Sequence, residues 1–112
     1  MVLALGDYRA KHRTLYFTRH ELNQLLSLYS RHVARGVWRD YAIDHRDGQA
    51  LFSVFRHTHE SAVYTIVKSA PHASGAVEFT VLFGRQRLSA TPSLTEALEI
   101  FRAKLALVPV AG

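Results

Sequence analysis

The sequence predicts a single α+β domain in which a helix, a four-stranded antiparallel β-meander and a second helix follow in order, with both helices on one face of the sheet. The prediction rests on two segments with the apolar period of a helix and on an intervening region in which apolar residues alternate. A chain of 112 residues is long enough for one such domain. We expect the domain at residues 17–107, with an N-terminal arm at 1–16 and a C-terminal tail at 108–112.

A capping box marks the start of the first helix. Thr18 and Glu21 have the spacing at which a hydroxyl and a carboxylate each accept a backbone N–H at a helix start. Gly36 supplies the left-handed residue that ends many helices. The apolar residues between them recur at helical spacing and are expected to form one stripe: Leu22, Leu25, Leu26, Tyr29 and Val33.

Residues 38–55 predict a β-hairpin around Asp47-Gly48, a dipeptide suited to the positive φ angles of a type I′ turn. Counting outward from a two-residue turn pairs Arg46 with Gln49 and, at the far end, Asp40 with Phe55. Because side chains alternate, one face is expected to be core: Tyr41, Ile43, Phe52 and Val54. The other face carries Trp38, Asp40, Asp44, Leu51 and Phe55.

A third strand is expected at residues 62–68, after a four-residue turn that places Phe55 beside Tyr64 and Phe52 beside Val67. The second sheet face then carries an apolar set that we call the predicted interaction face: Trp38, Leu51, Phe55, Tyr64 and Ile66. An uncovered antiparallel face is seldom so apolar. Three occupants could cover this face: the N-terminal arm, a second copy or partner protein, or stacked nucleic-acid bases. The fourth explanation is that the register of the third strand is misjudged.

The fourth strand is expected at residues 76–83, where apolar side chains again alternate, and residues 84–90 add at most a short ragged strand. A second capping box, Ser93 to Glu96, begins the second helix. Its apolar residues repeat the helical spacing of the first helix: Leu94, Ala97, Leu98, Phe101 and Leu105.

The chain is basic, with 14 Lys and Arg against 9 Asp and Glu and a formal charge of +5. Arginine suits bidentate contact with phosphate, so the charge is a mild indication of an anionic partner, although an ordinary solvated surface accounts for it as well. If nucleic acid is bound, the candidate contacts are Arg31, Arg35, Arg39, Arg56 and Lys68. Protonation of the seven His below pH ~6.5 would strengthen any anion binding.

Catalytic and metal chemistry find little support. The chain has no Cys, which excludes disulfides, thiolate zinc sites and Cys nucleophiles. No nucleophile elbow, phosphate loop or zinc-protease motif is present. Asp40 and Asp44 lie about 13 Å apart along a strand, too far for shared acid–base work. The pair His57 and His59 is typical of a solvated turn. We expect no enzyme activity, no cofactor and no metal.

Several segments resemble a known family. Phe17 to Leu22 with Tyr29, the heptapeptide Trp38 to Asp44, and Phe52 to Arg56 are similar to those of the alphaproteobacterial family catalogued as domain of unknown function 2794. The resemblance is clearest over residues 17–68. It implies the fold and a bacterial origin, and it brings no catalytic residues to transfer.

These observations predict a small cytoplasmic domain that acts as a non-catalytic protein-interaction or homo-oligomerisation module through the predicted interaction face. The N-terminus lacks the basic region and apolar length of a signal peptide, and no apolar run approaches the ~18 residues of a membrane span. The expected partner is a protein or a second copy, and no membrane contact is expected. The alternative is a basic RNA-binding domain, ahead of a small-ligand binder.

Overall fold

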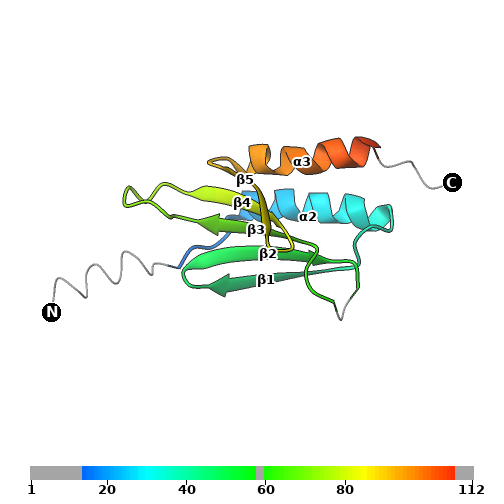
Figure 1. The fold of residues 1–112 in the computed structure, drawn as a ribbon, viewed down its shortest axis with the longest axis horizontal. Helices are drawn as coiled ribbons and strands as arrows, with labels where there is room; N and C mark the ends of the chain where they lie inside the picture. The colour runs from blue at the N-terminus through cyan, green and yellow to red at the C-terminus, as the bar shows by residue number, and fades with distance from the viewer. Residues whose placement is uncertain (1–13, 58–59, 108–112) are drawn as a thin grey trace.

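A five-stranded antiparallel sheet forms the framework of the part of the chain that the computed structural model describes, residues 14–57 and 60–107. Its strands lie in chain order (Figure 1): β1 (Asp40–Arg46), β2 (Gln49–Phe55), β3 (Tyr64–Ser69), β4 (Glu78–Phe83) and β5 (Gln86–Thr91). The helix α2 (Arg19–Ala34) precedes the sheet and α3 (Leu94–Leu107) follows it. The predicted α+β class with an antiparallel meander is therefore confirmed.

The predicted number of strands is one too few. Residues 86–91 form a full strand that pairs with β4 after a turn at Gly84, whose φ is +58°. The register shifts between Val81 and Leu82, which is a β-bulge. This irregularity and the low apolar content of β5 hide the alternation by which a strand is recognised in sequence.

The first helix begins as predicted. Thr18 is the N-cap: its Oγ1 accepts the Glu21 N–H at 3.1 Å, and Glu21 Oε1 accepts the Thr18 N–H at 2.8 Å. The helix ends at Ala34, followed by Gly36 with φ +72°. The predicted apolar stripe is displaced around the helix, however. The fully buried residues of α2 are Leu25, Leu28 and His32.

The first hairpin has the predicted register throughout β1 and β2, from Arg46 opposite Gln49 to Asp40 opposite Phe55. Asp47 and Gly48 both have positive φ, at 55° and 78°, as a type I′ turn requires. A two-residue turn leaves no freedom in the count, which is why the sequence sufficed here.

The predicted register of the next strand pair is wrong by one residue. Tyr64 lies opposite Val54, and Ile66 lies opposite Phe52. The connection at residues 56–63 is longer than the assumed four residues, so counting across it fails. A slip of one residue moves every side chain of β3 to the opposite face.

The core lies between the two helices and the face of the sheet that carries Phe52 and Ile66. Alternate residues of β2, β3 and β4 are buried there, and the buried residues of α2 and α3 belong to the same cluster: Leu25, Leu28, Ala50, Phe52, Val54, Tyr64, Ile66, Phe79, Val81, Leu94, Ala97 and Phe101. Tyr41 and Ile43 were expected in the core as well. They remain exposed because β1 is the edge strand, at the margin of the helical cover.

A buried ion pair joins the start of α2 to the sheet. Lys68, which is 7% exposed, donates from Nζ to Glu21 Oε1 at 2.8 Å and to the Tyr16 carbonyl oxygen at 2.9 Å. The ammonium also lies 5.9 Å from the centre of the Phe79 ring. The prediction that Lys68 contacts nucleic acid is therefore wrong, because its charge is satisfied inside the fold on the helix-facing side of β3.

Candidate protein-interaction surface

The structure does not bring the five residues of the predicted interaction face together. Tyr64 and Ile66 are core residues beneath the helices, as a result of the register slip. Leu51 and Phe55 lie half-buried on the opposite side of the sheet. Trp38 is 2% exposed, because it precedes the start of β1 at Asp40 and the side-chain alternation of the strand does not extend back to it.

Trp38 instead closes one end of the core. Its indole stacks on His32, with ring centroids 3.8 Å apart, and meets the edge of Phe101 at 5.7 Å and Tyr64 at 6.2 Å. Tyr29 lies on its outer side at 6.5 Å. An indole enclosed in this way is not available to a partner's side chains or to nucleic-acid bases.

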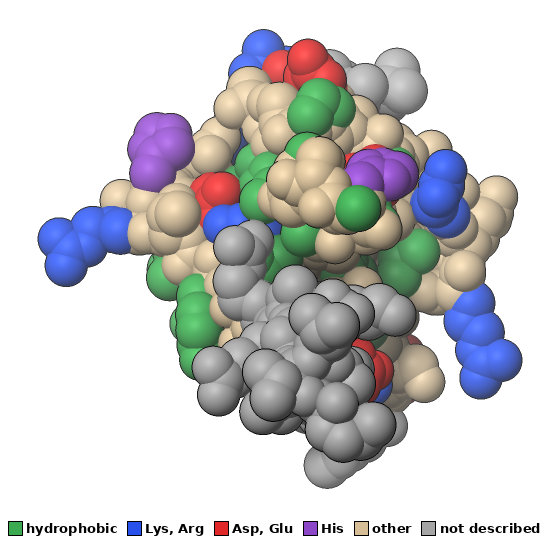
Figure 2. Space-filling model, turned by 90° about the vertical axis from the view of Figure 1, so that its left-hand side faces the viewer, with side chains coloured by type: hydrophobic (Ala, Val, Ile, Leu, Met, Phe, Trp, Pro, Cys, Tyr) green, Lys and Arg blue, Asp and Glu red, His purple; other side chains and the backbone are tan. Residues whose placement is uncertain are grey.

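A different apolar surface is open to solvent. Five large hydrophobic residues are exposed in the described part of the chain: Tyr16 63%, Val33 41%, Tyr41 39%, Ile43 41% and Phe83 44%. All but Phe83 lie where α2 and the segment before it pass beside β1. We call this the α2–β1 surface and define it as Tyr16, Tyr29, Val33, Tyr41, Ile43 and His45. In Figure 2, hydrophobic side chains reach the surface at the lower left of the molecule.

Ring contacts join both α2 and the segment before it to β1 on the α2–β1 surface. The Tyr16 ring lies 4.6 Å from His45, and the Tyr41 ring lies 4.8 Å from Tyr29. Tyr41, Ile43 and His45 alternate along β1 and so share one face. Val33 follows Tyr29 on the same side of α2. Beneath them, Tyr41 stacks on the core residue Phe52 at 5.5 Å.

Sequence reasoning assigned most of these residues to the core. The first helix carries two rows of residues, one formed by Leu25, Leu28 and His32 and an apolar one at positions 22, 26, 29 and 33. Together they are wider than a single contact with a sheet requires. Only the first row is fully buried, and Val33 at the end of the second is exposed. The excess width was the signal that pointed to a second contact surface.

The outer edge of β1 borders this surface. All residues from Tyr41 to Arg46 are exposed. Two aspartates cap backbone groups along the strand: Asp40 Oδ1 accepts the Tyr41 N–H and Asp44 Oδ1 accepts the His45 N–H, both at 2.8 Å. Asp44 also pairs with Arg46 at 3.0 Å. Hydrogen bonds from Arg46 and from the His45 N–H hold the pKa of Asp44 below its usual value.

Residues 15–86 match the model of a family described as protein of unknown function (DUF2794). The match covers more than half of the chain. The chain belongs to this family. The DUF2794 match confirms the resemblance seen in the sequence and extends it through β4, and it contains every residue of the α2–β1 surface. No curated protein and no solved structure matches the chain.

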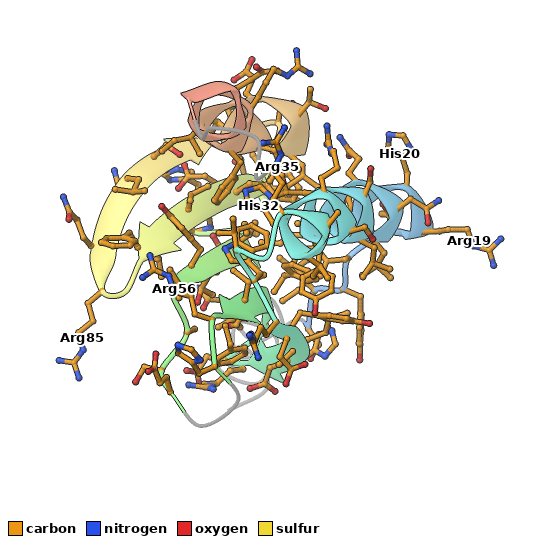
Figure 3. The ribbon with its side chains drawn as sticks, turned by 90° about the vertical axis from the view of Figure 1, so that its right-hand side faces the viewer. Arg19, His20, His32, Arg35, Arg56 and Arg85 are labelled. Atoms are coloured by element: carbon orange, nitrogen blue, oxygen red, sulfur yellow. The ribbon has the colours of Figure 1, made fainter. Side chains whose placement is uncertain are left out.

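The basic residues of this DUF2794 chain do not form one surface. Arg31 and Arg35 line a groove of about 710 Å³ between α2 and α3, with His20, Glu99 and Arg102. Arg39 and Arg56 are exposed at the end of the first hairpin. Figure 3 places Arg35 between the helices and Arg56 on the sheet side. The candidate nucleic-acid contacts are therefore divided between two places, with Arg31 and Arg35 in the groove and Arg39 and Arg56 at the end of the hairpin.

Other predictions for this DUF2794 chain concern metals and membranes. Within residues 14–57 and 60–107, no three His, Asp or Glu side chains gather as a metal site would require. His57 is exposed, and His59 lies outside the described residues. Neither helix in the described part of the chain is long and apolar enough to cross a membrane.

Proposed function

We propose that this chain is a non-catalytic protein-interaction module and that its contact surface is the α2–β1 surface, not the face predicted from the sequence. One observation carries the proposal. Four of the five exposed large hydrophobic residues of the described chain gather on this surface. Scattered exposed hydrophobics are ordinary, whereas a contiguous apolar group is typical of a contact surface.

The composition of the surface supports the same conclusion. Tyr16, Tyr29 and Tyr41 offer large, stiff side chains with a polar end, which are enriched at the centres of protein interfaces. Ile43 and Val33 add aliphatic area between them. Charged residues of β1, among them Asp40 and Arg46, border this centre, as a polar rim borders an interface core.

Site-specific photocrosslinking tests the proposal. A photoreactive phenylalanine analogue replaces Val33 on the α2–β1 surface or, as the matched control, Phe83, which is similarly exposed elsewhere. We expect the analogue at position 33 to give one discrete crosslinked product with a partner protein, and the analogue at position 83 to give none. The substitution Tyr41→Glu should abolish the crosslinked product from position 33. Equal labelling at both positions, or an adduct insensitive to Tyr41→Glu, would contradict the proposal.

Nucleic-acid binding is the second candidate, favoured by the cationic groove that Arg31 and Arg35 line with Arg102. Binding there would be electrostatic and would weaken steeply between ~50 and ~200 mM salt. Anisotropy of a labelled RNA measures it, with Arg31→Glu combined with Arg35→Glu as the disrupting variant. Salt-dependent binding that this variant abolishes would make RNA a ligand of the groove without involving the α2–β1 surface.

A further inference from the structure

We infer that the partner at the α2–β1 surface is a second copy of this chain, and that the two β1 strands pair antiparallel about Ile43 to form one continuous sheet across a two-fold axis. The inference rests on the proposed function and names its partner. It draws on the edge position of β1, the direction of its backbone groups and the order of its charges.

The backbone of β1 is suited to this pairing. Arg46 and Gln49 close a two-residue turn, so alternate residues from Arg46 back to Asp40 bond to β2. The N–H and C=O groups of Tyr41, Ile43 and His45 therefore point away from the sheet. An antiparallel pair centred on Ile43 sets Ile43 opposite itself and Tyr41 opposite His45 of the second copy. All three positions present outward groups, so the Ile43–Ile43 pair and both Tyr41–His45 pairs are hydrogen-bonded pairs.

The charges at both ends of β1 are self-complementary in this register. Centring on Ile43 places Asp40 opposite Arg46 of the second copy, and symmetry repeats the pair. Just outside the strand, Arg39 comes opposite Asp47 of the second copy in the same way. A shift by two residues in either direction breaks the match at both pairs. The sequence Arg-Asp thus occurs at each end of β1 with the spacing that a two-fold axis requires.

The pairing also covers the exposed apolar side chains. Tyr41, Ile43 and His45 lie on one face of β1, and the same three residues of the second copy would extend that face. The row would lie beside α2, where Tyr29 contacts Tyr41. Both halves of a two-fold interface bury the same patch, so one contact accounts for the α2–β1 surface of both copies.

Asp40 and Asp44 set the strength of the contact. In the single chain they occupy the N–H groups of Tyr41 and His45 with their own carboxylates, and pairing requires both N–H groups to be released. Asp40 then gains Arg46 of the second copy. Asp44 faces Ala42 of the second copy and gains no cation there. The aspartates therefore keep the edge covered at low concentration and weaken the dimer, a common protection of edge strands.

The mass of the protein in solution, measured by analytical ultracentrifugation over a range of concentrations, tests the inference. We expect a reversible dimer of the wild type. Ile43→Pro removes an N–H that points outward, which an edge strand tolerates, and should give a monomer; Ile43→Val keeps that N–H and should remain a dimer. Asp44→Ala should tighten the dimer by about threefold or more.

A charge exchange identifies the register. Arg46→Asp alone should weaken the dimer by about tenfold, because it sets two carboxylates opposite each other at both symmetric positions. Asp40→Arg added to Arg46→Asp restores the pair in reversed order and should return the dissociation constant to within about threefold of the wild type. Emission from buried Trp38 reports that each variant is folded.

The outcomes separate the two proposals. A wild type that stays monomeric, or a double variant that dimerises no better than Arg46→Asp, overturns the inference. If crosslinking from position 33 still depends on Tyr41 in a monomeric protein, the proposed function stands and the partner is another protein. If position 33 gives no Tyr41-dependent adduct and the protein is monomeric, both proposals fail.

Discussion

The imidazole of His32 lies flat against the indole of Trp38, with ring centroids 3.8 Å apart and ring planes 10° apart. His32 is 4% exposed, and its Nδ1–H donates to the Leu28 carbonyl oxygen at 3.0 Å. Burial lowers the pKa of His32 below its usual value, and the neighbouring cations Arg31 and Arg35 lower it further, while the hydrogen bond opposes them. The fold therefore holds the neutral ring.

This lowered pKa predicts a loss of stability in mild acid. The unfolded chain binds a proton near pH ~6.5 and the folded chain binds it only at lower pH, so stability is complete above ~6.5 and declines as pH falls below it. The free energy of urea unfolding, measured from pH 7.5 to 5, should fall. His32→Gln should flatten the decline, whereas His20→Gln, at an exposed position, should leave it unchanged. Equal slopes in all three proteins would contradict the assignment.

The Lys68 ion pair predicts a large effect of truncation. Lys68→Ala leaves the Glu21 carboxylate and the Tyr16 carbonyl without their shared cation, and should lower the free energy of unfolding by about 3 kcal/mol. Arg46→Ala removes an exposed pair with Asp44 and should cost less than about 1 kcal/mol. Urea denaturation of both variants measures the difference. A cost for Lys68→Ala as small as that of Arg46→Ala would show that the pair is not buried in solution.

The sequence predicted correctly those features that depend only on residues close together in the chain. The Thr18 capping box and the Asp47-Gly48 turn concern neighbouring residues, and both were predicted correctly. The register of β3 depended on the length of a connection, which follows from tertiary packing, and the error moved Tyr64 and Ile66 from the predicted contact face into the core.

The candidate surface was hidden for a related reason. The spacing of apolar residues indicates which residues of α2 and β1 share a face, but it does not show how far the helices extend across the sheet. Ile43 and Val33 therefore read as core, although the edge position of β1 leaves both exposed. The complementary charges at the two ends of β1 were visible in the sequence, and they acquired meaning only once β1 was known to be an edge strand.

The burial of Trp38 predicts its fluorescence. As the only tryptophan of the chain, it reports its own site directly. Its emission should be blue-shifted and resist quenching by iodide, because the indole lies among His32, Tyr64 and Phe101. The same protein in concentrated guanidinium is the control and should be red-shifted and readily quenched. If the native protein emitted at as long a wavelength as the unfolded chain and were quenched as readily, the indole of Trp38 would be exposed to solvent, which would contradict the prediction.

The corrected register of β3 predicts that polar substitutions lower the stability by very different amounts at Ile66 and Leu51. A four-residue turn would place these two side chains on one face of the sheet. Ile66 is fully buried, so Ile66→Asn puts an amide into the apolar core and should cost at least about 4 kcal/mol, enough to unfold much of the protein. Leu51 is half-buried on the other face, and Leu51→Asn should cost only about 1 kcal/mol.

Ile66→Val provides the matched control, because it keeps the apolar character of the site and should cost about 1 kcal/mol. Thermal and urea unfolding of the three variants measure the order. Similar losses for Ile66→Asn and Leu51→Asn would mean that the two side chains share an environment, as the shorter turn requires. A much larger loss for Ile66→Asn than for Leu51→Asn shows that β3 turns its apolar row toward α2 and α3.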